Sequence, residues 1–323
     1  MDKKNRLLIR KRPSLTRRFP QVISTHPLER KKAGWVIFSQ RLTPDLFDDI
    51  NFFTGIKHKI LDVWKVGQYE VALMSGEVTE QHEEILQALK LDYARLSDLP
   101  DLTKPGLIVL DMDSTAITIE CIDEVAKLAG VGEEVEQITE RAMQGELDFE
   151  QSLRSRVALL KGADEAILEE VRSQLTFTPD LIELINTLKT YGWKTAIASG
   201  GFTFFSDYLQ EKLKLDNAIS NHLEVIEGKL TGNIVGSVVS AQTKADSLHQ
   251  LAEQYDIELH NTIAVGDGAN DLLMMDSAGL GVAYHAKPKV EKAAQSALRN
   301  SALGGVLCIL SAGLAQKNRL SHT

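Results

Sequence analysis

The chain of 323 residues is long enough for two domains, and its 43% hydrophobic and 25% charged residues are typical of a folded globular protein. The net charge is −9, and the excess acid lies beyond the first 32 residues, so the body of the chain is not expected to bind nucleic acid by charge attraction. The longest uncharged stretch near the end, residues 301–315, is too short and too rich in Gly and Ser to span a membrane. Only Cys121 and Cys308 are present, which excludes a disulfide framework and favours a cytoplasmic location.

Residues 1–33 form a basic N-terminal arm. The arm lacks the apolar core of a secretory signal, so we expect a solvated and poorly ordered terminus. Contact of this arm with nucleic acid or anionic lipid is the alternative interpretation.

Residues 34–98 predict a separate small α+β domain. The predicted order is strand 34–38, helix 43–53, strands 59–65 and 69–74, helix 79–89 and strand 93–96. This βαββαβ order is the ferredoxin-like pattern, and the unit resembles the small amino-acid-sensing modules that are fused to metabolic enzymes. No motif specifies a ligand, so packing or homodimerisation is an equal alternative. Residues 98–104, with Pro100 inside the range and Pro105 directly after it, are the predicted linker.

The stretch from Gly106 to Thr115 is the centre of the remaining chain. Its apolar run Leu107–Leu110 predicts a strand buried on both faces of a parallel sheet. Asp111 and Asp113 follow at the carboxyl end of this strand, where open α/β sheets bind their ligands. Alternate residues of an extended chain point the same way, so the two carboxylates should face one pocket. Because two neighbouring anions repel each other, a divalent cation is expected beside them. The alternative is a turn that uses aspartate only for its backbone hydrogen bonds.

The chain from residue 117 to about 190 changes to helical periodicity, and this position directly after the first strand is that of a cap over a substrate. Beyond residue 194, strands and helices alternate, which predicts a doubly wound parallel sheet and hence an α/β fold. The predicted ranges are 195–198, 203–213, 218–225, 241–255, 262–265 and 270–278, with a hairpin near residues 232–236.

Three further stretches carry polar residues at predicted element ends. They are Ser199-Gly200-Gly201 after a strand, Lys244 at the start of a helix, and Gly266-Asp267 with Asp271 after another strand. Each alone has a structural explanation: a capping serine, a solvated lysine or a turn aspartate. Together, in the order Asp-x-Asp-x-Thr, Ser, Lys and Gly-Asp-x-x-x-Asp, they resemble the haloacid dehalogenase superfamily of phosphatases over residues 105 to about 310. The resemblance implies a phosphatase domain at 105–323 that contains the helical cap.

The same resemblance implies a role for each matched residue. Asp111 would be the nucleophile that forms an aspartyl-phosphate, and Asp113 the general acid and base. Mg²⁺ would be held by Asp111, Asp267 and the main-chain carbonyl of Asp113. Ser199, the Gly200 amide and Lys244 would bind the phosphate, while Asp271 would orient Lys244 or a metal-bound water.

Four residues of the predicted cap resemble the substrate pocket of phosphoserine phosphatases: Glu120, Met143, Phe149 and Arg156. In that family the glutamate meets the substrate ammonium and the arginine its carboxylate, and Asn270 would add a polar contact. The implied reaction is hydrolysis of O-phospho-L-serine, the last step of serine biosynthesis. The alternative functions are a phosphatase or phosphotransferase for another small phosphomonoester, or a catalytically silent serine sensor. For Glu120 alone, the alternative to substrate binding is an ion pair with an arginine at the surface.

Overall fold

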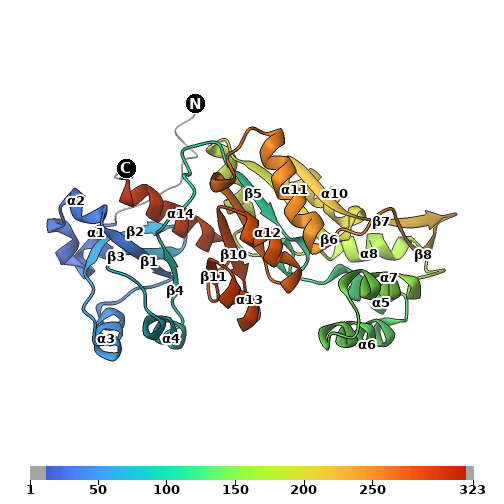
Figure 1. Cartoon of the computed structure of the whole chain (residues 1–323), viewed down its shortest axis with the longest axis horizontal. Coiled ribbons are helices and arrows are strands. Elements are labelled where there is room, and N and C mark those ends of the chain that lie inside the picture. The colour runs from blue at the N-terminus through green and yellow to red at the C-terminus, as the bar shows by residue number, and fades with distance from the viewer. Residues whose placement is uncertain (1–11, 318–323) are drawn as a thin grey trace.

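The computed structural model describes residues 12–317, except for the side chains of Ser24, Pro27 and Met143. It contains a four-stranded and a seven-stranded sheet, which share one continuous hydrophobic core. The molecule is elongated, with the small sheet at one end, the large sheet in the middle and a group of helices at the other end (Figure 1). The first eleven residues of the predicted basic arm lie outside the described part of the chain.

The N-terminal sheet confirms the predicted ferredoxin-like order. Its strands are β1 (Ala33–Ser39), β2 (Ile60–Val66), β3 (Tyr69–Ser75) and β4 (Asp92–Arg95), and its helices are α3 (Pro44–Thr54) and α4 (Glu80–Ala88). The strands are antiparallel in the order β2-β3-β1-β4. Side chains alternate across β1: Trp35 and Ile37 pack toward α3 and α4, whereas Val36 and Phe38 join the core shared with the large sheet.

The expectation of a solvated arm is wrong for residues 13–30. This segment forms α1 (Pro13–Arg18), a short 3₁₀ turn (Pro20–Ser24) and α2 (Pro27–Arg30). Leu15, Phe19 and Val22 are buried in the core of the N-terminal domain, and Arg18 forms an ion pair with Glu70 at 2.6 Å. The basic composition concealed these three apolar residues. Their burial stabilises the fold by more free energy than the loss of conformational entropy in the arm costs.

The large sheet is of the doubly wound type predicted from the alternation of elements. Its strands are β5 (Leu107–Leu110), β6 (Lys194–Phe202), β7 (Asn217–Ile226), β8 (Lys229–Val235), β9 (Thr262–Gly266), β10 (Leu280–Tyr284) and β11 (Ser296–Leu298). The order is β11-β10-β9-β5-β6-β7-β8, and every pair is parallel except β7 with β8. β10 and β11 were not predicted, and the hairpin turns at Glu227 and Gly228 rather than at residues 232–236.

Helices cover both faces of this sheet. Leu107 and Val109 pack on one face with side chains from α11 (Ala241–Gln254), α12 (Leu272–Ser277) and α13 (Pro288–Ala293). Ile108 and Leu110 pack on the other with α9 (Leu181–Thr190), α10 (Thr203–Leu213) and α14 (Gly304–Gln316). The strand order reverses at β5, which has β6 on one side and β9 on the other, so the carboxyl ends of these strands form the expected binding edge.

The helical insertion predicted after the strand that is now β5 is present but shorter than expected. It consists of α5 (Cys121–Leu128), α6 (Gly132–Met143), α7 (Phe149–Leu159) and α8 (Ala166–Ser173). The segments that enter and leave it meet at the isolated Ile117–Phe177 bridge, whereas α9 buries Leu184 and Leu188 in the core. The helical pattern of α9 could not reveal which layer it packs against.

The last helix, α14, joins the two parts of the molecule. All its residues from Gly304 to Ala315 are buried, and it packs against the N-terminal sheet as well as against α9. Trp64 Nε1 donates a hydrogen bond to Ser311 Oγ at 2.9 Å, and Asp92 accepts the Ser301 amide at 2.6 Å. Within residues 12–317, no helix is long and apolar enough to cross a membrane.

Candidate active site

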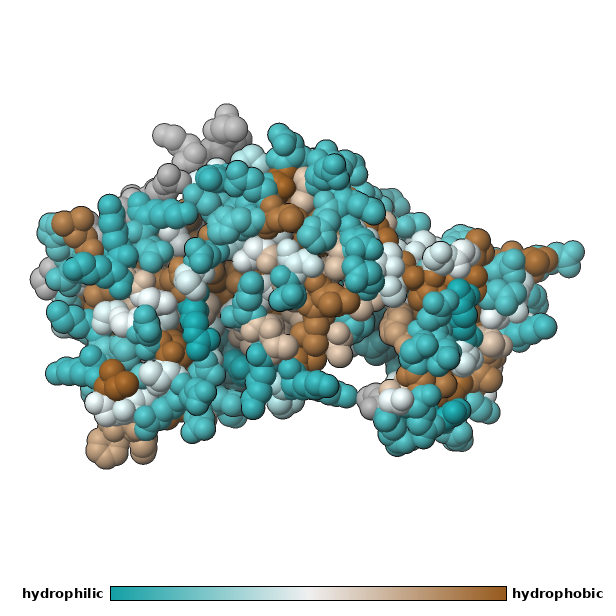
Figure 2. All heavy atoms as spheres, viewed as in Figure 1, coloured by the Kyte–Doolittle hydropathy of each residue, from teal (hydrophilic) through white to brown (hydrophobic). Residues whose placement is uncertain are grey.

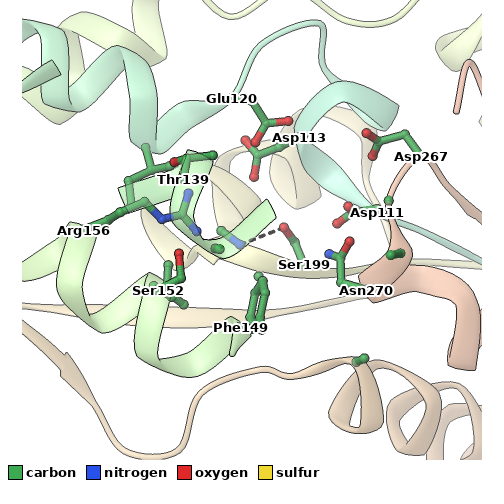
Figure 3. A pocket seen from close by; sticks show the side chains of 18 of the residues that line it. Asp111, Asp113, Glu120, Thr139, Phe149, Ser152, Arg156, Ser199, Asp267 and Asn270 are labelled. Atoms are coloured by element: carbon green, nitrogen blue, oxygen red, sulfur yellow. Dashed lines mark hydrogen bonds between the residues drawn. The ribbon is translucent and has the colours of Figure 1, made fainter. Parts of the chain in front are cut away.

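A cavity of about 870 Å³ lies between the cap helices and the carboxyl edge of the large sheet. Figure 2 shows the surface hollowed between α13 and α6, and Figure 3 shows polar side chains converging inside. Nine of the predicted site residues line the cavity: Asp111, Asp113, Glu120, Phe149, Arg156, Ser199, Gly200, Asp267 and Asn270. Lys244 and Asp271 lie buried beneath it, and the side chain of Met143 lies outside the described structure.

Three charged groups are locked together at the floor of the cavity. Lys244 Nζ lies 2.8 Å from Asp111 Oδ1 and 2.7 Å from Asp271 Oδ1, and the Lys244 and Asp271 side chains are fully buried. Burial lowers the pKa of Lys244, but the two carboxylates outweigh burial and hold it above its ordinary value. Asp111 Oδ1 also accepts the Met112 amide at 2.8 Å. Together these bonds fix the orientation of the Asp111 carboxylate.

Asp113 is directed into the cavity by an unusual turn. The chain leaves β5 through a kinked turn, Met112–Ala116, in which Asp113 is extended and Ser114 adopts the left-handed conformation with φ of 54°. The Cys121 amide donates to Asp113 Oδ1 at 2.9 Å. Removal from water, together with the charges of Glu120 and Asp111, raises the pKa of Asp113 to about 7. A carboxyl group with this pKa can donate or accept a proton at neutral pH.

Carboxylate oxygens of Asp111, Asp267 and Asp271 lie within 4.8 Å of one another. Burial and the neighbouring Asp111 raise the pKa of Asp267 to about 7, because its ionised form is removed from water and repelled by the other carboxylates. Oxygen-only ligands in this arrangement fit a hard divalent cation. Asp271 already binds Lys244 through Oδ1 and the Gly268 amide through Oδ2 at 3.0 Å. Asp271 is therefore in contact with Lys244, one of the two partners expected for it.

The end of β6 supplies a glycine-rich turn beside these carboxylates. Ser199 is buried, and its Oγ accepts a hydrogen bond from the Gly201 amide at 2.9 Å. A Cβ atom on Gly200 would lie 2.7 Å from the Phe149 ring, and one on Gly201 would lie 2.6 Å from Asp113 Oδ2. A side chain at either position would therefore displace Phe149 or Asp113 from the place it occupies.

The cap presents one cation and one anion to the cavity. Arg156 reaches in from α7, and Glu120 lies near Asp113 at the entrance to α5 (Figure 3). Glu120 accepts a hydrogen bond from Ser114 Oγ at 2.6 Å. Among the described residues, Arg156 Nε is buried without a hydrogen-bond partner. A buried N–H donor without a partner destabilises the protein, and a hydrogen bond to an anionic ligand would remove this penalty.

Several lining residues were not predicted: Thr139, Ser152, His285, Lys287 and Lys289. Ser152 lies on the same face of α7 as Phe149 and Arg156, so helical spacing alone could have identified it. His285 is exposed, bonds Ser301 O through Nε2 at 3.0 Å and also lines the cavity. The two lysines follow β10, a strand that the sequence analysis missed.

Comparison with known proteins agrees with this geometry. Residues 105–279 match the model of the haloacid dehalogenase-like hydrolases, and residues 31–95 match a domain of unknown function. The chain is 65% identical to the phosphoserine phosphatase of Vibrio cholerae, with 99% of this chain and 98% of that protein covered. It is 48% identical to the phosphoserine phosphatase of Haemophilus influenzae, over 93% and 96% of the two chains.

Solved structures extend the comparison. The crystal structure of the unliganded probable phosphoserine phosphatase from Vibrio cholerae superposes with a TM-score of 0.91 at 64% identity, covering 99% of both chains. A substrate-bound phosphoserine phosphatase has a TM-score of 0.60 at 43% identity, covering 63% of this chain and 97% of that one. The sequence resemblance to this family is confirmed. The chain belongs to the phosphoserine phosphatases of the haloacid dehalogenase-like hydrolases.

Proposed function

We propose that this protein hydrolyses O-phospho-L-serine to L-serine and phosphate with the help of Mg²⁺. Similar proteins carry the name of this activity, and one solved relative is described as an analogue of the phospho-aspartyl intermediate. The observation that carries the assignment to a carboxylate-bearing substrate is the buried Nε of Arg156, which has no partner among the described residues and lies across the cavity from Asp111.

Asp111 is the nucleophile in this proposal. Lys244 and the Met112 amide bind Oδ1, which leaves Oδ2 to attack phosphorus. The bond from Oδ2 to phosphorus forms as the bond from phosphorus to the serine oxygen breaks, and Asp113 gives its proton to that oxygen. Asp113 then takes a proton from water, whose oxygen attacks phosphorus and releases phosphate from Asp111. The pKa of about 7 suits Asp113 to both transfers.

The phosphate oxygens are held by Ser199, the Gly200 amide and Lys244. Lys244 is buried and held by two carboxylates, so its ammonium needs no reorganisation as charge develops on the phosphoryl group. Mg²⁺ would be held by Asp111, Asp267 and the Asp113 carbonyl, where it would offset the repulsion between a phosphate dianion and Asp111.

The remainder of the substrate is recognised by the cap. Arg156 would bind the substrate carboxylate through a two-point hydrogen-bonded contact, and Glu120 would bind the ammonium. Phe149, which packs over Gly200, and Asn270 would enclose the carbon chain between cap and sheet. This complement suits a zwitterion that carries a phosphate.

The test is phosphate release from a panel of phosphomonoesters with Mg²⁺ or with a chelator. We expect phosphoserine to be hydrolysed with the highest kcat/KM and activity to be lost on chelation. Equal rates with phosphoethanolamine or an aryl phosphate would reduce the assignment to a general phosphatase. Transfer of phosphate to an added alcohol in place of water would favour the phosphotransferase alternative.

Homodimerisation through the N-terminal domain and a cytoplasmic location belong to the same proposal. Phe52 and Phe53 near the end of α3, and Ile56 just beyond it, are exposed apolar side chains whose burial would stabilise a dimer. Figure 2 shows apolar surface at this end of the molecule. The mass measured by light scattering should fall when Phe52 and Phe53 are both changed to Ser; a monomeric wild type would contradict the dimer.

A further inference from the structure

Asn221 joins two segments that supply groups to the phosphate site. It lies on β7 with 2% of its surface exposed, and it is not among the described residues that line the cavity. Its Nδ2 donates to the Gly200 carbonyl at 2.8 Å, and its Oδ1 accepts the Val239 amide at 2.8 Å. If the side-chain amide of Asn221 were rotated by half a turn, its NH2 group would face the Val239 amide and its oxygen would face the Gly200 carbonyl. The two contacts therefore fix the orientation of the side chain.

The bond to Gly200 replaces one that the sheet cannot make. β6 pairs with β7 at Ala198–Ile219 and next at Phe202–Asn221, so four residues of β6 advance against two of β7. The turn at residues 199–201 therefore bulges from the ladder, which leaves the Gly200 carbonyl without a strand partner. Asn221 supplies that partner from its side chain.

The bond also controls the direction of the Ser199 hydroxyl. In a planar trans peptide the carbonyl of Gly200 and the amide of Gly201 point in opposite directions. With the carbonyl held by Asn221, the Gly201 amide points at Ser199 Oγ, 2.9 Å away, as the dashed line in Figure 3 shows. Because Oγ accepts this bond, the Ser199 proton is available for an acceptor in the cavity.

The second bond of Asn221 acts on the helix that carries Lys244. Val239 precedes Ser240, whose Oγ caps α11 by accepting the Thr243 amide at 3.2 Å. The Lys244 amide in turn bonds the Ser240 carbonyl at 3.0 Å. A single buried side chain thus ties the turn of Ser199 to the first turn of the helix that presents Lys244.

We propose that Asn221 is a positioning residue that sets Ser199 and Lys244 for phosphate binding. The inference rests on the proposed phosphatase function, because it concerns the same site. Asn221 touches neither substrate nor metal in this scheme. Its loss should therefore weaken every phosphate-bearing ligand alike and leave recognition of the serine portion unchanged.

The test uses Asn221→Asp, which keeps the acceptor for Val239 but sets a carboxylate oxygen against the Gly200 carbonyl. The matched control is Asn261→Asp, because Asn261 is equally buried, accepts the Asp101 amide at 2.6 Å and donates to the Pro105 carbonyl at 2.7 Å, outside the site. Three quantities are measured: the Kd of inorganic phosphate by calorimetry, kcat/KM for phosphoserine and phosphoethanolamine, and inhibition by L-serine.

We expect Asn221→Asp to weaken phosphate binding and to lower both kcat/KM values by similar factors of roughly 10- to 100-fold, with inhibition by serine unchanged. Asn261→Asp should lower only Tm. If Asn221→Asp is unfolded by circular dichroism, Asn221→Ser is used, whose hydroxyl can satisfy one partner. A folded Asn221 variant with wild-type phosphate affinity would overturn the inference. A wild type that binds phosphate but does not hydrolyse phosphoserine would instead remove the proposed function, and the binding comparison would still decide the role of Asn221.

Discussion

Lys244 Nζ lies 2.8 Å from Asp111 Oδ1, so the most buried cation of the site directly contacts its proposed nucleophile. This contact places a positive charge beside the Asp111 carboxylate, in a site where the carboxylates of Asp267 and Asp271 lie within 4.8 Å. The same ammonium lies where it can contact a phosphoryl group attached to Asp111. Lys244 can therefore stabilise the charge of the free carboxylate before attack and that of the phosphoryl oxygens after it.

Asp111→Asn should lower turnover by roughly 10⁴-fold or more, because it removes the attacking anion with little change in shape. No acid-stable, hydroxylamine-labile phosphoenzyme should be trapped by rapid quenching of labelled phosphoserine. Asp271→Asn is the control: it keeps the nucleophile and should still form phosphoenzyme, at a lower rate. Labelled phosphate on Asp111→Asn would mean that a different residue is the nucleophile.

Arg156→Ala should lower kcat/KM for phosphoserine by roughly 10- to 150-fold, which corresponds to the 1.5–3 kcal/mol of a hydrogen bond to a charged group. Phosphoethanolamine has no carboxylate and should lose much less, whereas Glu120→Gln should penalise both of these substrates and spare an aryl phosphate. The matched control is Arg154→Ala, since Arg154 lies on the same helix but pairs with Glu150 at the surface. Equal losses on all substrates would assign Arg156 to the fold.

A chain that starts at Asp101 should keep the chemistry but lose solubility. Every predicted site residue lies beyond Asp101, yet α14 packs its apolar surface against the N-terminal sheet that would be removed. We expect most of the truncated protein to aggregate and its monomeric fraction to hydrolyse phosphoserine at a rate near that of the full chain. The measurement is activity per folded molecule after size-exclusion chromatography. A folded, inactive monomer would show that the N-terminal domain completes the site.

The N-terminal domain should lose stability as the pH falls below about 6.5, because it buries His82 in its neutral form. His58 Nδ1 donates to the Ser75 carbonyl at 2.7 Å, and His58 Nε2 lies 2.8 Å from His82 Nε2. Burial, and then the nearby His58, lowers the pKa of His82. The unfolded chain therefore binds a proton at a higher pH than the folded chain, and stability present above about pH 6.5 is lost on acidification.

His82→Gln should reduce the acid dependence of the free energy of unfolding, by at most about 1.4 kcal/mol per pH unit for one proton. The measurement is urea unfolding between pH 5 and pH 8 by circular dichroism. His249→Gln, at an exposed position on α11, is the control and should keep the wild-type slope. The prediction fails if both variants show the wild-type dependence on pH.

The sequence was most informative where chemistry restricts the choice of residue. Asp111, Ser199, Lys244 and Asp267 each stand at the end of a predicted strand or the start of a predicted helix, so the rule for parallel sheets brings them together before any coordinates are known. Residues that act by supporting others, such as Asn221, give no such signal. Their role depends on which strand bulges and which carbonyl is left unpaired, and both are decided by tertiary packing.

Strands β10 and β11, the helices of residues 13–30 and the packing partner of α9 were not predicted, because each depends on tertiary contacts that the local sequence does not reveal. β11 has three residues, and β10 contains a glycine and an alanine, so neither shows the long branched apolar run of a buried strand. The helices of residues 13–30 were hidden by their basic composition, because local charge density gives no information about a distant apolar surface. α9 was recognised as a helix but assigned to the cap, because periodicity identifies a helix and its apolar face but not its partner.

The position of α14 has a consequence for the order of events during synthesis. The strands of the N-terminal sheet are synthesised well before the helix that covers their second face, which spans Gly304–Gln316. Val36, Phe38 and Trp64 therefore remain exposed to water, or to a chaperone, until residues 304–316 have been translated. A nascent chain halted before residue 304 should have an N-terminal domain that proteases cut readily, and completion of the last helix should protect it.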